Sequence, residues 1–107
     1  LAGEIGSRPK TIVHSDLRAD NLLFGSPGSD DWVIIIDWQL AIKSMGAFDV
    51  ARLTAGSEPV SELRKYHYEA VGRWLDALGE GGVGGYTRDD AVRDYKLGLL
   101  FNLCWPV

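Results

Sequence analysis

The feature that most constrains this chain is a polar segment followed closely by an apolar run that ends in a carboxylate. The segment spans residues 14–21, with a carboxylate at Asp16 and a carboxamide at Asn21, and the apolar run 32–36 leads into Asp37. Phosphoryl transfer requires such groups, because one carboxylate orients the acceptor hydroxyl while oxygen ligands hold Mg²⁺ against the nucleotide phosphates. The spacing therefore predicts a kinase-type centre that uses ATP and Mg²⁺.

Each of these three residues also has a simpler interpretation. Asp16 could cap the turn that follows it, Asn21 could be a turn residue, and Asp37 could cap the segment after the strand, because Asp and Asn favour such positions for local hydrogen bonding. Their combined spacing favours the catalytic and metal-binding roles over these structural ones. We expect Asp16 to be catalytic and Asn21 and Asp37 to be the magnesium ligands that bind the nucleotide.

Further polar residues are expected to support this centre. His14 is expected to organise the loop through a hydrogen bond from its ring. Arg18 could meet phosphate or substrate, although a solvated charge is the simpler interpretation, and the same default applies to Asp20. Asp49 lies among apolar residues, where an unpaired charge is costly, so it either supports the backbone of the catalytic loop or caps a helix.

Short apolar runs predict the secondary structure around the loop. Residues 11–13 and 22–24 are expected to be strands, and the second of them should form a hairpin with 32–36 across a turn rich in Gly, Ser, Pro and Asp. Because 32–36 is apolar at every position, we expect protein to cover both of its faces. Residues 1–10 are expected to be a loop or the remainder of a helix.

Two helices are expected in the second half. Apolar residues recur at helical spacing from about Val60 to Leu78, and the glycine-rich stretch 79–85 should end that helix. Thr87 and Asp90 then form a capping box for a second helix. Its buried face is expected to contain Ala91, Val92, Tyr95, Leu99, Leu100 and Leu103.

Composition limits the classes of partner and compartment. The net charge of -4 argues against nucleic-acid binding, which needs a basic face. No apolar run approaches the roughly 20 residues that span a bilayer, so we expect no membrane partner. The single cysteine, Cys104, cannot form an internal disulfide and is expected to be buried, which favours the cytoplasm.

Three ordered motifs resemble the aminoglycoside/choline-kinase-like phosphotransferases, particularly their ecdysteroid-kinase-like branch. They are residues 14–24, the Ile-Asp-Trp-Gln of 36–39 and the Gly-Ala-Phe-Asp-Val-Ala of 46–51, and segments 66–70 and 94–99 are also similar. The resemblance implies an α+β, protein-kinase-like fold. Residues 1–107 would be a partial, mainly helical C-terminal lobe in which a small β-hairpin carries the catalytic loop.

The resemblance also implies roles for individual residues. Asp16 would be the catalytic residue, Asn21 and Asp37 the Mg²⁺ ligands, and the acceptor a small hydroxylated molecule. The sequence departs from the family in two respects. Ser15 stands where the family commonly has Gly. The N-terminal lobe, with its glycine-rich loop and lysine, is absent, so the chain alone is expected to have little or no turnover.

Two other functions stay open at this point. A catalytically inactive kinase-like binding module would tolerate loss of the three key residues, so their joint presence counts against it. A protein Ser/Thr kinase is compatible with the loop spacing, but Asp-Trp-Gln at 37–39 replaces Asp-Phe-Gly, and segment 40–47 is short for a peptide-docking loop. The acceptor and the oligomeric state are not indicated by the sequence.

Overall fold

The computed structural model describes residues 2–30, 32–57 and 60–104. The elements follow in the order α1 (Ala2–Ser7), β1 (Thr11–Val13), a 3-10 turn (Ala19–Asn21), β2 (Leu22–Phe24), β3 (Val33–Ile35), a second 3-10 turn (Trp38–Leu40), β4 (Ile42–Ser44), α2 (Ala47–Ser57), α3 (Val60–Glu80) and α4 (Arg88–Cys104). This mixture confirms the predicted α+β class.

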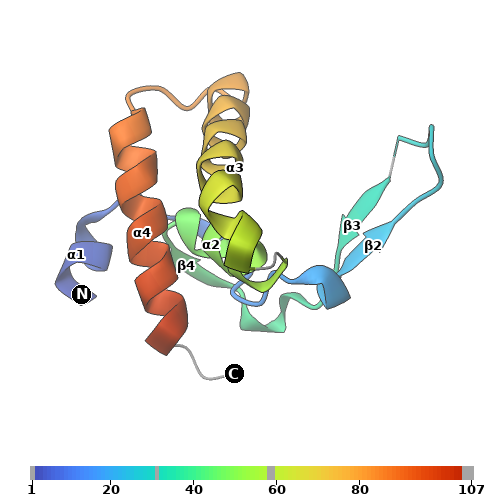
Figure 1. Cartoon of the computed structure of the whole chain (residues 1–107), viewed down its shortest axis with the longest axis horizontal. Coiled ribbons are helices and arrows are strands. Elements are labelled where there is room, and N and C mark those ends of the chain that lie inside the picture. The colour runs from blue at the N-terminus through green and yellow to red at the C-terminus, as the bar shows by residue number, and fades with distance from the viewer. Residues whose placement is uncertain (1, 31, 58–59, 105–107) are drawn as a thin grey trace.

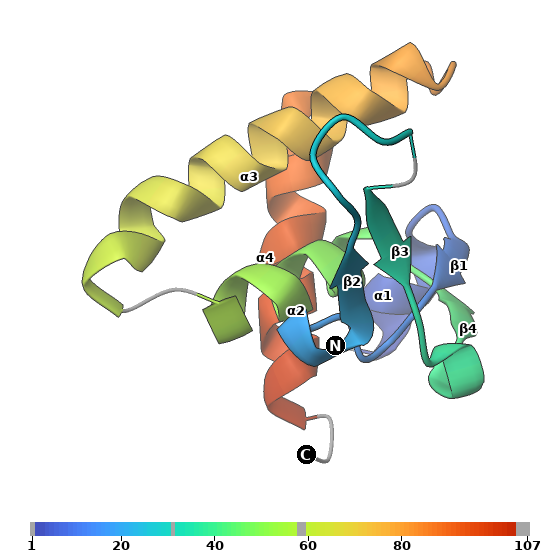
Figure 2. The ribbon, with the colours of Figure 1, turned by 90° about the vertical axis from the view of Figure 1, so that its right-hand side faces the viewer.

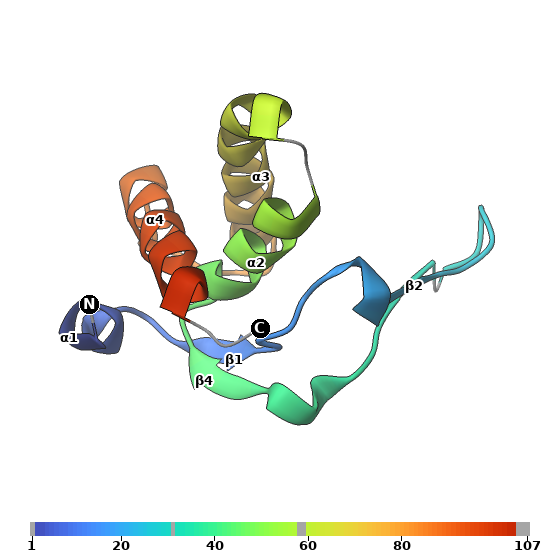
Figure 3. The same ribbon diagram turned by 60° about the horizontal axis from the view of Figure 1, so that its bottom comes forward.

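The helices form one layer and the short strands lie beside it. Strand β1 pairs antiparallel with β4, close to α2 (Figure 3). Strand β2 pairs antiparallel with β3, with Leu22 opposite Ile35, which confirms the predicted hairpin. This hairpin extends away from the helices (Figure 1), while α3 crosses α4 (Figure 2). The loop between β1 and β2 therefore lies where the helical layer meets the hairpin.

Helices α2 and α4 pack closely because a glycine lies at their contact. A Cβ at Gly98 would lie 2.9 Å from the carbonyl oxygen of Ala47, closer than a side-chain carbon can approach. The adjoining core contains Ala51, Val71, Ala91 and Tyr95, all buried. Small residues on α2 and α4 thus bring the two backbones together and fix the direction of α2, which carries Asp49 toward the loop.

The start of α4 confirms the predicted capping box. The backbone N–H of Asp90 donates to Thr87 Oγ1 at 3.1 Å, and the backbone N–H of Thr87 donates to Asp90 Oδ2 at 3.0 Å. These bonds and the contact with Arg8 lower the pKa of the Asp90 carboxyl below its ordinary value. Because the folded-state pKa is depressed, this stabilisation is fully present above a pH of about 4 and is lost in more acidic solution.

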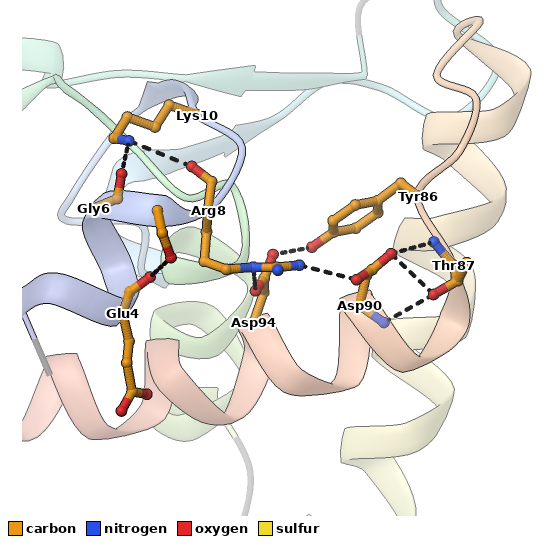
Figure 4. Close-up of polar contacts among 9 residues, drawn as sticks. Glu4, Gly6, Arg8, Lys10, Tyr86, Thr87, Asp90 and Asp94 are labelled. Carbon is orange, nitrogen blue, oxygen red and sulfur yellow. Dashed lines mark hydrogen bonds and ion pairs between the residues drawn. The ribbon is translucent and has the colours of Figure 1, made fainter.

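A polar network attaches the N-terminal segment to α4 (Figure 4). Arg8 Nε donates to Asp94 Oδ1 at 2.6 Å, and Tyr86 donates its hydroxyl proton to Asp94 Oδ2 at 2.5 Å. The Asp94 side chain is buried, with only 1% of its surface exposed. Burial, together with the bond to Asp94, raises the pKa of Tyr86, which keeps the phenol protonated as the donor. The local sequence around Arg8 and Asp94 does not predict this network.

Several sequence predictions about burial are wrong. Strand β3 is exposed throughout, from 37% at Ile35 to 49% at Ile34, because among the described elements β2 and β3 pack extensively only on each other. On α4, Leu100 and Leu103 are exposed, whereas Leu97 and Gly98 are buried. Cys104 is exposed rather than buried, because it lies at the end of α4 beyond the contact with α2.

The helix limits are close to those expected. Residues 2–7 form a short helix, one of the two expected alternatives, and α3 continues to Glu80 before the glycine-rich connection. The side chain of Leu63, expected on the apolar face of α3, lies outside the described residues. Among the described residues, no helix has the length and apolar character needed to cross a bilayer.

Candidate active site

The loop after β1 is held by the first turn of α2. Asp49 accepts hydrogen bonds from the backbone N–H groups of His14, at 2.7 Å, and Ser15, at 3.0 Å. One carboxylate thus satisfies two buried loop donors, which is the first of the two arrangements expected for Asp49. Each bond is charge-assisted, so the pair holds the loop against α2 more firmly than neutral partners could.

Ser15 has a strained backbone within this loop. Its φ is +76°, in the left-handed region that favours glycine. This conformation explains why a glycine is expected at this position in the family that the sequence resembles. The serine hydroxyl is buried and has no hydrogen-bond partner in the described part of the chain. The Asp49 contacts next to it help to hold this costly conformation.

The ring of His14 connects the loop to the strand that precedes Asp37. Its Nδ1 accepts a hydrogen bond from the backbone N–H of Asp16 at 3.1 Å, so the ring proton is on Nε2. Nε2 donates to the carbonyl oxygen of Ile36 at 2.7 Å, and the edge of the ring packs against Trp38. His14 is almost completely buried, as a residue that organises the loop should be.

The side chains of Asp16 and Asn21 lie in contact. Asn21 Nδ2 donates to the Asp16 backbone oxygen at 2.9 Å and approaches its carboxylate Oδ2 at 3.4 Å. Because both of these partners are acceptors, the amide nitrogen must face Asp16, and Oδ1 of Asn21 receives no hydrogen bond from any residue that the structure describes. The arrangement thus leaves an oxygen of Asn21 for another donor or for a cation.

Asp37 directly follows Ile36, whose backbone pairs with that of Asn21. The N–H of Ile36 donates to the carbonyl oxygen of Asn21 at 2.9 Å, which extends the β2–β3 pairing by one step. Asp37 follows with a left-handed backbone, φ +63°, and an exposed side chain. Among the described residues, no hydrogen bond or ion pair joins its carboxylate to Asp16 or Asn21.

The donor set fits a magnesium ion bound together with nucleotide phosphates. Mg²⁺ prefers oxygen ligands and is commonly held by one or two protein groups plus phosphates and water. The amide oxygen of Asn21 and the exposed carboxylate of Asp37 are such groups. No cluster of three His, Cys, Asp or Glu side chains suited to a metal occurs in the described ranges, so a cage built of protein ligands alone is not indicated there.

Two arginines contact the carboxylate of Asp16. Arg52 donates to Oδ1 at 3.2 Å, and Arg18 Nε lies 3.6 Å from the same oxygen. The sequence singles out Arg18 but not Arg52. The signal that could have indicated Arg52 is its spacing from Asp49, because residues three apart on one helix share a face, and here that face meets the loop.

Asp49→Asn should weaken both the loop and the fold. The amide can accept from only one of the two backbone donors, and the loss of charge weakens that bond, so we expect the free energy of unfolding to fall by about 2 kcal/mol. Urea denaturation of the natural full-length protein measures the change.

Asp89→Asn is the matched control for this substitution. Like Asp49, Asp89 is an acidic residue in the first turn of a helix, but it is exposed, whereas Asp49 is half-buried, and it does not contact the loop. It removes the same charge from the same kind of helical position. Equal destabilisation by the two variants would show that the Asp49 contacts contribute nothing beyond the interaction with the helix dipole.

The fold and the loop together define a class of protein, the phosphotransferases. The chain matches the phosphotransferase enzyme family (APH) over residues 2–92, and it belongs to this family. The match includes the whole loop, the hairpin, α2 and α3. The comparisons with curated proteins and with solved structures gave no match.

Proposed function

We propose that this chain is the catalytic part of an ATP-dependent kinase that phosphorylates a hydroxyl group of a small molecule. Membership of the phosphotransferase family supports the reaction class. The observation that carries the proposal is the contact of Asp16 with Asn21, which leaves the carboxylate beside an amide whose oxygen has no donor within the described ranges. The ecdysteroid-kinase-like branch, suggested by the sequence motifs, is part of the proposal.

In this proposal each residue of the loop has a separate task. Asp16 orients the acceptor hydroxyl and accepts its proton. Asn21 and Asp37 hold the cation, while His14 and Asp49 fix the backbone that carries Asp16. Bound Mg·ATP supplies the γ-phosphoryl group, which bonds to the acceptor oxygen as ADP leaves with the electrons of the broken bond. The family match does not favour an inactive binding module or a protein Ser/Thr kinase.

We also propose that the 107 residues alone have little or no activity. Apolar side chains of the hairpin are exposed, including Phe24 at 67% and Ile34 at 49%. A contiguous exposed apolar surface of this kind normally contacts another protein surface. A nucleotide-binding lobe is the occupant that the proposed reaction needs. The cytoplasm is the proposed location, because a lone cysteine that forms no internal disulfide suits a reducing compartment.

The experiment is a panel of hydroxylated metabolites incubated with the natural full-length protein, ATP and Mg²⁺. The proposal predicts ADP release that depends on one class of acceptor, together with a product heavier by one phosphoryl group in mass spectrometry. ADP release that is equal with and without every acceptor, and that yields no phosphorylated product, would contradict it.

A further inference from the structure

A cavity of about 470 Å³ lies beside the proposed catalytic carboxylate. It is bounded by the C-terminal halves of α2 and α4 and by the loop that carries Asp16. Its described lining consists of two arginines, one carboxamide and small or apolar residues, namely Arg18, Arg52, Ala55, Gly56, Leu99, Asn102 and Leu103. A volume of this size is within the range of small-molecule sites.

The charge of this cavity is positive. Arg18 and Arg52 both contact Asp16 Oδ1, so two guanidinium groups face a single carboxylate. None of the described lining residues is acidic. A polycationic acceptor would therefore meet uncompensated positive charge, whereas an oxyanion could pair with the guanidinium groups in a bidentate manner.

The remaining wall of the cavity is apolar. Leu103 is 83% exposed and Leu99 is half-buried, and both lie on the part of α4 that borders the cavity. An exposed leucine alone is ordinary, but here it adjoins two charged groups and a catalytic-type carboxylate. An amphipathic molecule fits this combination better than a uniformly polar one.

A larger cavity, of about 580 Å³, is less suited to the acceptor. It lies between β1, α2 and α3 and includes Asp49, whose two oxygens already bind the backbone of His14 and Ser15. In the described part of the chain, none of its lining residues forms a hydrogen bond or ion pair with the side chain of Asp16. The smaller cavity is the one whose walls touch the group that would receive the proton.

We infer that the acceptor is a molecule that carries an oxyanionic group, a carboxylate or a phosphate ester, close to the hydroxyl that is phosphorylated. The inference rests on the proposed function. The guanidinium of Arg52 lies 3.2 Å from Asp16 Oδ1, so an anion bound there lies within a few bonds of a hydroxyl at Asp16. A 3-hydroxy acid whose alkyl chain lies along Leu99 and Leu103 has this geometry.

The test compares matched acceptors in the natural full-length protein with ATP and Mg²⁺. The probes are 3-hydroxydecanoate and its uncharged methyl ester, glycerol 3-phosphate and glycerol, and choline as a cationic alcohol. We expect kcat/KM for at least one anionic probe to exceed that of its neutral partner by about tenfold or more, and to exceed that of choline. The two anionic probes distinguish a carboxylate from a phosphate ester.

Arg52→Gln should bring the ratio of kcat/KM for the anionic probe to kcat/KM for the neutral probe closer to one. The ratio of kcat/KM between the anionic and the neutral probe is the informative quantity, because a purely structural effect on Asp16 lowers both values equally. Arg18→Gln, in a half-exposed loop position, provides a second variant should Arg52→Gln fail to fold. Arg73→Gln is the matched control, since Arg73 borders the larger cavity and pairs only with Glu69 among the described residues.

Three results would overturn the inference while leaving the kinase function intact. They are equal activity on each anionic probe and its neutral partner, a preference for choline, and an unchanged ratio in both arginine variants. Selectivity lost in Arg73→Gln instead would assign the acceptor to the larger cavity. Failure of every anionic probe also counts against the inference, provided that Mg²⁺-dependent nucleotide binding persists. Loss of that binding would instead remove the proposed function.

Discussion

Asp16→Asn is expected to lower kcat of the natural full-length protein by between about a hundredfold and ten-thousandfold. The amide can still fill the space and accept a hydrogen bond, but it cannot take the proton of the acceptor hydroxyl, and positioned proton transfer contributes a factor of this size. The measurement is the steady-state rate of ADP release with the best acceptor from the panel. The folded state should persist, because neither of the Asp49 contacts is altered.

Asp20→Asn is the control for this prediction. Asp20 lies in the same loop, within the 3-10 turn Ala19–Asn21, and it is exposed. It carries the same charge a few residues away, so a general electrostatic effect should appear in both variants. A comparable fall in both, or activity of Asp16→Asn within a few-fold of the wild type, would show that Asp16 does not act on the proton.

Asp94→Asn is expected to have the largest effect on stability, a loss of about 3 kcal/mol in the free energy of unfolding. The substitution removes the buried one of the two carboxylates that pair with Arg8, and removing one partner of a buried ion pair costs more than the pair itself contributes. Tyr86 also loses its charged acceptor. Urea denaturation measures the loss, and the segment that contains Arg8 should show faster amide exchange.

A double replacement separates this charge effect from loss of packing. In Arg8→Met/Asp94→Leu both charges are replaced by apolar groups, which avoids an unpaired buried charge. The double variant should therefore be more stable than Asp94→Leu alone. If it is less stable, Arg8 stabilises the fold through contacts other than the one with Asp94, such as its ion pair with Asp90. If Asp94→Asn unfolds at the same midpoint urea concentration as the wild type, the network does not stabilise the fold.

The elements nearest the loop could be predicted because their determinants are local. The hairpin follows from two short apolar runs around a turn, and the start of α4 follows from Thr87 and Asp90, which contact one another within one turn. Asp49 could be expected to need a partner because its neighbours are apolar. The hairpin and the capping box are decided by residues close together in the sequence. The local sequence of Asp49 indicates that it needs a partner but not which one, because His14 and Ser15 lie 35 and 34 positions away.

The remaining features depend on residues far apart in the chain. Arg8 and Asp94 are 86 positions apart, and nothing in their local sequence indicates that they meet. Arg52 and Asp16 are 36 positions apart and come together only because α2 packs against the loop. The apolar run of β3 was expected to be covered on both faces, yet burial depends on which elements pack there, and a local pattern does not contain that information.

Magnesium-dependent nucleotide binding tests the central claim most directly. The natural full-length protein is titrated calorimetrically with a non-hydrolysable ATP analogue, with Mg²⁺ and with EDTA, alongside Asn21→Ala, Asp37→Asn and the hairpin control Asp30→Asn. The account predicts that Mg²⁺ tightens binding and that Asn21→Ala and Asp37→Asn each reduce this gain by about tenfold or more, while Asp30→Asn retains it. Binding that is indifferent to Mg²⁺, or a gain that survives both substitutions, would contradict it.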